Sequence, residues 1–181
     1  MNGTVSAPPA TLDLRSPEEG MTMNGAAASS SATVARHSHD DGATTDVASE
    51  GEVRIASESD IVTARKIVRA QAAALGFGVT DVTRIVTAAS ELTRNIYRYA
   101  GCGFMRWRCL YAAQDAGLEL VFADEGPGIA DVDKALESGY TTGNGLGMGL
   151  PGAKRLMDEL EVCSEVGKGT TITARKWMRS A

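Results

Sequence analysis

The sequence of 181 residues lacks the features of membrane-spanning, secreted and metal-stapled proteins. Its apolar runs fall short of the ~18 residues that span a bilayer, and residues 1–10 lack the basic and apolar regions of a secretory signal. Three cysteines (Cys102, Cys109 and Cys163) match neither zinc-site nor disulfide spacing. They are expected to be small reduced hydrophobic residues, so the sequence predicts a cytoplasmic protein.

Residues 1–51 contain no Phe, Trp or Tyr and are rich in Ala, Ser, Thr and acidic residues. Such a segment buries too little apolar surface to offset roughly 1–2 kcal/mol of backbone entropy per ordered residue. It is predicted to be a disordered acidic N-terminal extension, and residues 52–181 are predicted to form one domain.

A basic excess is also missing. Residues 1–51 carry a net charge of −5, whereas residues 52–181 hold 16 basic and 16 acidic side chains. A neutral domain offers no electrostatic footprint for nucleic acid. No nucleic-acid or membrane partner is therefore expected.

What is present is a periodic α/β pattern. Apolar residues at helical spacing predict helices at 61–75 and 81–100, with Gly76 as the cap that stops the first. Strands are predicted at 52–56, 104–112, 118–123, 161–165 and 170–177, with short helices at 131–138 and 151–160. These elements predict a two-layer α/β sandwich, in which a mixed sheet is covered by helices on one face. The expected helical core stripes are Ile61, Ala64, Val68, Ala72 and Leu75, followed by Val82, Ile85, Val86, Ala89, Leu92 and Ile96.

The second helix carries Glu91 and Asn95, which are one turn apart and share a face beside the core stripe. Mg²⁺ takes few protein oxygens beside phosphates, and a neutral amide can anchor it. Glu91 has the chemistry of a general base for an attacking hydroxyl or water. A solvated helix flank would show the same pair, so the helix alone does not decide.

Asp124 ends the predicted strand and is followed by Gly126, Gly128 and Ile129. Its carboxylate can accept a hydrogen bond from the exocyclic amine of adenine, worth about 1.5–3 kcal/mol, whereas the carbonyl of guanine would be repelled. The two glycines allow close approach of the backbone to the base, and Ile129 offers an apolar wall. An ordinary turn would share this sequence.

Gly143, Gly145, Gly147 and Gly149 free several backbone N–H groups just before a helix. That arrangement binds phosphate, although the Lys-Ser/Thr of a Walker loop does not follow. Helix, acidic turn and glycine loop together predict a Mg-nucleotide site.

In order and spacing, four motifs resemble the boxes of the GHKL (Bergerat-fold) ATPase/kinase superfamily. They are Glu91-x-x-x-Asn95, Asp124-x-Gly126-x-Gly128, Gly145-x-Gly147-x-Gly149 and Gly169-Thr170. The resemblance covers residues 52–181 and implies a Bergerat α/β sandwich that binds ATP with Mg²⁺.

By the same resemblance, Asp124 binds adenine, Asn95 holds the metal, and Thr170 supports Asp124 and a water at the base. The resemblance also implies that residues 139–149 act as a mobile lid. The nucleotide-binding residues that it implies there are Thr141, Thr142, Gly145, Leu146, Gly147, Met148 and Gly149.

Within the superfamily, the downstream transducer domain of gyrase, Hsp90 and MutL is not expected here, and both histidines lie in the predicted N-terminal extension rather than on a dimerisation helix. The chain resembles instead the stand-alone regulatory kinases, in particular the RsbT-type switch serine/threonine kinase of the bacterial stressosome. The segments that carry this resemblance are 90–101, 139–142, 149–159 and 174–177. The N-terminal extension departs from that compact pattern, and its role stays open.

The resemblance implies an ATP-dependent serine/threonine kinase that phosphorylates STAS-domain proteins and then binds and activates a PP2C-type phosphatase. The alternative is an anti-sigma factor that sequesters a sigma factor, with kinase activity secondary. A weaker alternative is a domain that binds ATP without catalysis, against which the presence of Glu91 argues. The nucleotide motifs do not separate the first two, although Leu150-Pro151-Gly152 favours the switch kinase.

Overall fold

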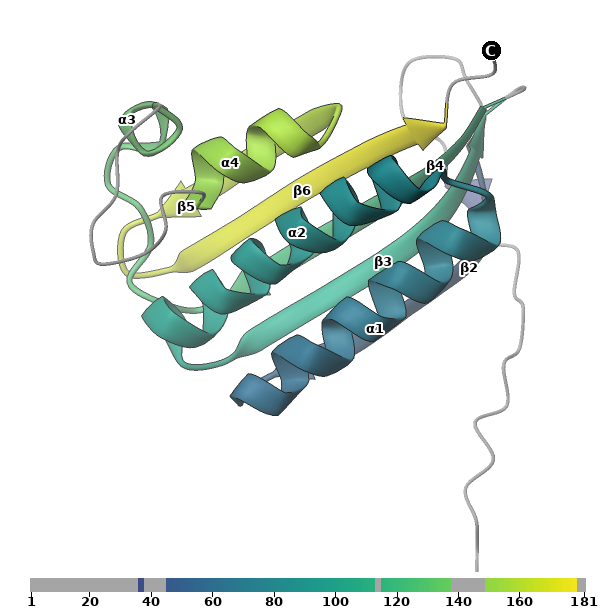
Figure 1. Cartoon of the computed structure of the whole chain (residues 1–181). Coiled ribbons are helices and arrows are strands. Elements are labelled where there is room, and N and C mark those ends of the chain that lie inside the picture. Colours follow the sequence, from purple (N-terminus) through teal and green to yellow (C-terminus); the bar gives the residue numbers. More distant parts are fainter. Residues whose placement is uncertain (1–35, 38–44, 113–114, 138–148, 179–181) are drawn as a thin grey trace, which may run out of the picture. The chain divides into compact units, whose positions relative to one another are not determined.

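Helices lie on one face of an antiparallel sheet in the computed structural model of the chain (Figure 1). The structure describes residues 36–37, 45–112, 115–137 and 149–178. The strands are β1 (Arg36–His37), β2 (Thr45–Ile55), β3 (Gly103–Ala112), β4 (Asp115–Asp124), β5 (Glu159–Glu165) and β6 (Gly169–Met178). The helices are α1 (Glu58–Leu75), α2 (Val79–Asn95), the π-helix η1 (Ile96–Ala100), α3 (Val132–Ala135) and α4 (Gly149–Leu156).

The strand order in the sheet is β1-β2-β3-β4-β6-β5. The predicted two-layer α/β fold class is confirmed, but the expectation of a mixed sheet is wrong, because every pairing between described strands is antiparallel. The crossover through α3 and α4 does make β5 run parallel to β4. However, β6 lies between these two strands and pairs antiparallel with both.

The strand β2 begins at Thr45, so the domain boundary predicted between residues 51 and 52 falls inside it. Its first half is polar, yet it pairs along β3 from Thr45↔Ala112 to Ile55↔Gly103, with one irregularity between Val47 and Ser49. Pairing with a neighbouring strand outweighs weak intrinsic β-propensity here. Residues 1–35 lie outside the described residues.

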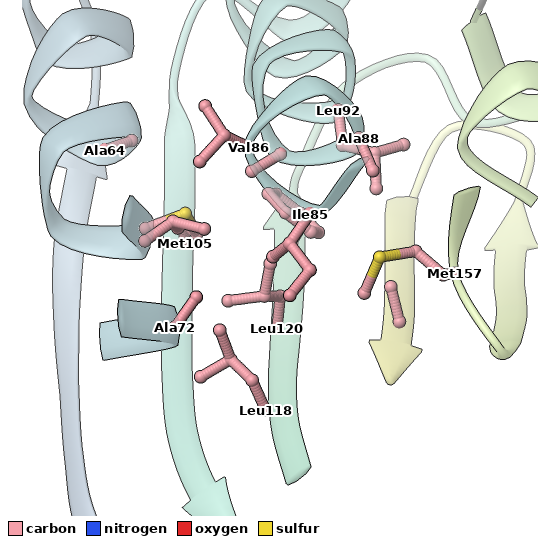
Figure 2. Close-up of a cluster of buried hydrophobic side chains, with 14 of the residues drawn as sticks. Ala64, Ala72, Ile85, Val86, Ala88, Leu92, Met105, Leu118, Leu120 and Met157 are labelled. Atoms are coloured by element: carbon pink, nitrogen blue, oxygen red, sulfur yellow. The ribbon is translucent and has the colours of Figure 1, made fainter. Parts of the chain in front are cut away.

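The core lies between the helices and the sheet, where Ile85, Leu92, Met105, Leu118 and Leu120 are almost fully buried (Figure 2). All eleven residues of the two predicted helical stripes are buried. Gly76 ends α1 in the left-handed conformation, with φ of 92°. Both predictions are thus confirmed, since apolar residues at helical spacing must face a partner layer. None of the described helices combines the length and apolar character needed to cross a lipid bilayer.

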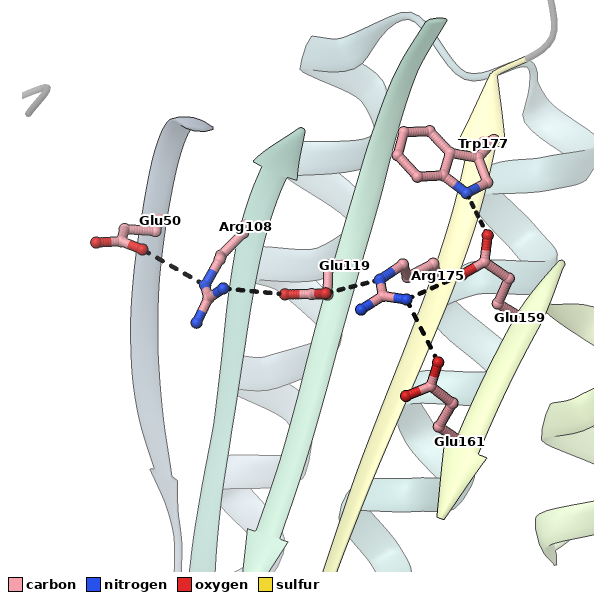
Figure 3. Close-up of polar contacts among 7 residues, drawn as sticks. All are labelled: Glu50, Arg108, Glu119, Glu159, Glu161, Arg175 and Trp177. Atoms are coloured by element: carbon pink, nitrogen blue, oxygen red, sulfur yellow. Dashed lines mark hydrogen bonds and ion pairs between the residues drawn. The ribbon is translucent and has the colours of Figure 1, made fainter. Parts of the chain in front are cut away.

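The opposite face of the sheet carries a charged ladder, which we define as Glu50, Arg108, Glu119, Arg175, Glu159 and Glu161 (Figure 3). Glu119 is buried between two arginines, 3.4 Å from Arg108 Nη1 and 2.7 Å from Arg175 Nε. Arg175 also reaches Glu159 at 3.0 Å. Side chains that neutralise one another in this way allow one face of an antiparallel sheet to remain uncovered.

Hydrogen bonding within this ladder shifts two pKa values. Partial burial disfavours the Glu159 carboxylate, but hydrogen bonds from Trp177 and Arg175 outweigh that effect and lower its pKa. Burial likewise opposes the charge of Arg175, yet its hydrogen bonds to Glu159 and Glu119 raise the pKa of the guanidinium. Glu159 lies on β5 and Arg175 lies on β6, so the ladder connects these two strands.

Candidate functional site

The candidate site begins at the corner where β4 ends. Asp124 is the last residue of β4 and lies directly opposite Thr170 on β6. Residues paired in this way have Cβ atoms about 4.5–5.5 Å apart on the same face of the sheet. The Oδ1 atom of Asp124 accepts a hydrogen bond of 2.8 Å from the backbone N–H of Gly126. This contact fixes the carboxylate and leaves Oδ2 for a ligand.

Two glycines hold this corner closed by backbone contact. A Cβ at Gly169 would lie 2.0 Å from the carbonyl oxygen of Asp124, and one at Gly128 would lie 2.2 Å from that of Glu165. Both glycines have positive φ, at 99° and 72°. The backbone N–H of Gly167 also donates to Pro127 at 2.9 Å. The turn after β4 and the turn between β5 and β6 are therefore packed main chain on main chain, which only glycine permits.

Ser164, which the sequence reasoning missed, is the hydrogen-bond hub of the corner. Its Oγ atom accepts from Ile129 N–H at 2.8 Å, donates to Gly169 C=O at 2.9 Å and lies 2.8 Å from Thr170 Oγ1. The available signal was the alternation of β5, which turns residues 160, 162 and 164 to the same side. A small polar residue at the end of that inward row indicates a buried polar contact.

The flank of α2 provides the second part of the site. Glu91 and Asn95 are both half-buried, next to a fully buried stripe. Glu91 Oε1 is 2.6 Å from Arg94 Nη1, and this ion pair is partly exposed. After Asn95 the helix widens into the π-helix η1, a change that helical periodicity did not predict. Wide turns of this kind occur frequently at functional sites.

Helix and corner meet through η1. A Cβ at Gly126 would lie 2.7 Å from the Cβ of Ala100, the last residue of η1. A Cβ at Gly103 would lie 2.8 Å from the Ile96 side chain and 2.4 Å from the carbonyl oxygen of Ala123. The C-terminal end of α2 and the acidic turn are therefore brought to the same end of the sheet.

The third part is described only at its end. Gly149 begins α4 with φ of 25°, and the next four residues, from Leu150 to Ala153, are buried. The packing of α4 against α2 brings the end of the predicted lid toward the helix that carries Glu91. The remaining lid residues that the sequence singles out lie outside the described residues: Thr141, Thr142, Gly143, Gly145, Leu146, Gly147 and Met148.

The side chains of the site carry oxygen atoms of the kind that bind Mg²⁺. Asn95 offers a neutral amide oxygen at the end of α2, whereas the nearby Glu91 carboxylate is already paired with Arg94. Mg²⁺ bound to nucleotide phosphates needs only one or two protein oxygens. The residues present therefore fit Mg²⁺ with Asn95 as its protein ligand, and Ile129, half-buried against the core, fits an apolar wall beside a base.

Comparisons with known proteins identify the family of the domain. Residues 55–176 match the sequence model of the histidine kinase-like ATPase domain. The chain is 51% identical over 127 residues to the serine/threonine-protein kinase RsbT of Bacillus subtilis (strain 168), covering 70% of this chain and 96% of that protein.

Anti-sigma F factors are more distant relatives. The one from Thermoanaerobacter sp. (strain X514) is 35% identical over 123 residues, covering 65% of this chain and 85% of the relative. The one from Halalkalibacterium halodurans is 38% identical over 121 residues, covering 62% and 81%. A solved structure of the RsbU and RsbW domains of Rv1364c from Mycobacterium tuberculosis aligns with a TM-score of 0.48 at 20% identity, over 72% of this chain and 34% of that one.

The match to the family model over most of the domain confirms the predicted superfamily, and the identity to RsbT confirms the predicted enzyme class. The chain therefore belongs to the histidine kinase-like ATPase domain family, as a homologue of the serine/threonine-protein kinases of partner-switching stress regulation.

Proposed function

We propose that the site transfers the γ-phosphoryl group of ATP to a serine or threonine hydroxyl of a STAS-domain partner. The observation that carries the proposal is the packing of Gly126 against Ala100. This packing brings the Asp124 carboxylate, which can bind adenine, to the same end of the sheet as α2. That helix carries Glu91 as a base and the amide oxygen of Asn95 as a metal ligand. These are the groups that phosphoryl transfer requires.

At the corner, Asp124 Oδ2 accepts a hydrogen bond from the exocyclic amine of adenine, while Oδ1 is held by Gly126. The absence of side chains at Gly126 and Gly128 lets the turn pack closely against Ala100 and Glu165, and Ile129 packs against the face of the base. Thr170, directly opposite Asp124, completes the polar edge of the pocket. Because the corner is held by backbone contacts, it is ordered before the nucleotide arrives, which lowers the entropic cost of binding.

On the flank of α2, Glu91 acts as general base. It takes the proton from the attacking hydroxyl as the new oxygen–phosphorus bond forms and the bond between the γ-phosphorus and the bridging oxygen breaks, so that ADP leaves. Asn95 holds Mg²⁺, which when bound supplies positive charge beside the phosphate oxygens. The backbone amides of residues 143–149 are proposed to stabilise charge on the transferring group.

Arg94 has a role before the substrate arrives. Its guanidinium lies 2.6 Å from Glu91 Oε1 and is more than half exposed. An exposed ion pair of this kind contributes little stability, of order 0–1 kcal/mol, so an incoming hydroxyl displaces it easily. The pairing holds the Glu91 carboxylate in one orientation until then.

After transfer, the kinase is proposed to leave its phosphorylated STAS partner and to bind and activate a PP2C-type phosphatase. The second candidate function is sequestration of a sigma factor, and the observation that favours it is the 35–38% identity to anti-sigma F factors. The two functions share the nucleotide site and differ in the protein that the chain retains.

The test incubates the full chain with γ-labelled ATP, Mg²⁺ and purified STAS-domain proteins, and then maps the labelled residue. Label on a serine or threonine of a STAS protein supports the kinase, and a STAS variant with alanine at the mapped residue is the matched control. Parallel pull-downs use a sigma factor and a PP2C-type phosphatase as bait. Retention by the sigma factor alone, without label transfer, would contradict the proposal.

A further inference from the structure

The hydroxyl of Ser164 is surrounded by three polar neighbours with different capacities. Ile129 N–H can only donate, and Gly169 C=O can only accept. The third neighbour, Thr170 Oγ1, can do either. A serine hydroxyl has one proton and two lone pairs, so the first two neighbours decide how it is used.

The proton of Ser164 goes to the carbonyl of Gly169, because a carbonyl has no proton of its own and the hydrogen bond between the two groups needs one. One lone pair of Ser164 takes the N–H of Ile129. The remaining lone pair faces Thr170 Oγ1 at 2.8 Å. All three contacts form together only when Thr170 donates its own proton to Ser164. The direction of the bond between the two hydroxyls is therefore set by the backbone groups on either side.

Thr170 is 8% exposed and lies across from Asp124 at the proposed adenine pocket. With its proton committed to Ser164, Thr170 can offer only lone pairs to a base or to a water on the base. A lone pair suits the exocyclic amine of adenine and opposes a carbonyl at the same ring position. Asp124 also prefers the amine to the carbonyl, so both residues favour adenine.

We propose that Ser164 is a positioning residue that sets Thr170 as a hydrogen-bond acceptor and thereby sharpens the preference of the site for a 6-amino purine over a 6-oxo purine. The proposal rests on the proposed nucleotide site. Ser164 touches no ligand in this account, because it acts through Thr170. It also ties Ile129, the apolar wall, to the same hydroxyl.

The test compares the dissociation constants of ATP and inosine triphosphate, which carries a carbonyl in place of the amine, by calorimetry on the full chain with Mg²⁺. In Ser164→Ala the Thr170 hydroxyl is released and can donate to the carbonyl. The ratio of the inosine to the adenosine constant is expected to fall about three- to tenfold, the worth of one neutral hydrogen bond. Ser164→Thr, which retains the hydroxyl, is expected to restore the ratio.

Thr171→Ala is the matched control. Thr171 is the next residue of β6 and is exposed on the opposite face of the sheet, so the ratio should stay at the wild-type value. If Ser164→Ala does not fold, as judged by its thermal transition, Ser164→Cys replaces it. A thiol is a weak acceptor of similar shape, and the ratio should fall in the same direction.

A purely structural role predicts a different result. The loss of bonds to Ile129 and Gly169 would weaken both nucleotides alike and leave the ratio unchanged, and that outcome overturns the inference while the proposed function stands. If the wild-type chain binds neither nucleotide, the proposed function fails and this inference fails with it.

Discussion

The corner around Asp124 is held by main-chain contacts too close for any side chain, whereas the Glu91 carboxylate on the flank of α2 is held by a side-chain ion pair. At the corner, Gly128 and Gly169 leave no room for a Cβ. On the flank, Glu91 is joined to Arg94 by a partly exposed ion pair. In the proposed function, the fixed corner recognises the base and the adjustable flank of α2 contacts the protein substrate.

The largest expected effect concerns Glu91 on the flank of α2. Glu91→Ala should lower phosphate transfer to a STAS partner by about 10²–10⁴-fold, because the attacking hydroxyl loses its base. The affinity for ATP should change little, since the corner is untouched. Steady-state transfer rates and calorimetric ATP titrations check the two halves of this statement. Undiminished transfer would remove Glu91 as the base.

The next prediction concerns the close backbone packing of the corner around Asp124. In Gly169→Ala the new Cβ would lie 2.0 Å from a backbone oxygen, at φ of 99°, so the corner must open. The unfolding free energy should fall by more than about 3 kcal/mol, and ATP binding should be lost. Urea denaturation and calorimetry are the measurements.

Gly167→Ala is the control for that test. This glycine has φ of 79° but nothing within 4 Å of the added Cβ. Only the backbone conformation is unfavourable, so about 1–2 kcal/mol of stability is expected to be lost and ATP affinity retained. Equal losses in the two variants would show that close packing does not define the corner.

A smaller effect sharpens the comparison at the carboxylate itself. Asp124→Asn preserves shape but removes the charge and presents an amide to the exocyclic amine of adenine. ATP affinity should fall about 10- to 150-fold, which corresponds to about 1.5–3 kcal/mol for a hydrogen bond to a charged group. Wild-type affinity in a calorimetric titration would refute the adenine contact.

The smallest expected effect concerns pH. The lowered pKa of Glu159 means that its contribution to stability is present above the unfolded-state pKa of about 4.3 and is lost as the pH falls through the lower folded-state value. The stability difference between wild type and Glu159→Gln should therefore shrink as the pH is lowered from 6 to 3. Urea denaturation at each pH measures it, and a constant difference would contradict the assigned pKa direction.

The helices were predictable from sequence because their signal is local. The α1 stripe from Ile61 to Leu75 repeats with the helical period, and Gly76 is the residue type that ends a helix in the left-handed conformation. The end of α2 was less predictable, since the π-helix from Ile96 to Ala100 has one buried residue, Ile96, and therefore carries almost no periodic signal.

The strands depend more on distant partners. The polar half of β2, from Thr45 to Gly51, forms because β3 lies beside it. The residues of that half do not by themselves predict the pairing with β3. The sheet was expected to be mixed, and a helical crossover does join β4 to β5. Only the insertion of β6 between them makes the pairings antiparallel, and the order of strands is not written in any local pattern.

In the candidate site, residue types with distinctive chemistry were predictable as candidates. Asp124, Gly128 and Thr170 meet at one corner as the motifs suggested. Ser164 was missed because serine is common in surface strands. Its importance comes from contacts with two other segments, Ile129 after β4 and the start of β6 at Gly169 and Thr170.

The position of β6 has a consequence for how the protein is made. It is the latest of the described strands in sequence, yet it lies in the interior of the sheet between β4 and β5 and supplies both Gly169 and Thr170. A nascent chain therefore lacks Gly169 and Thr170 of the proposed purine pocket until residues 169–178 have emerged from the ribosome.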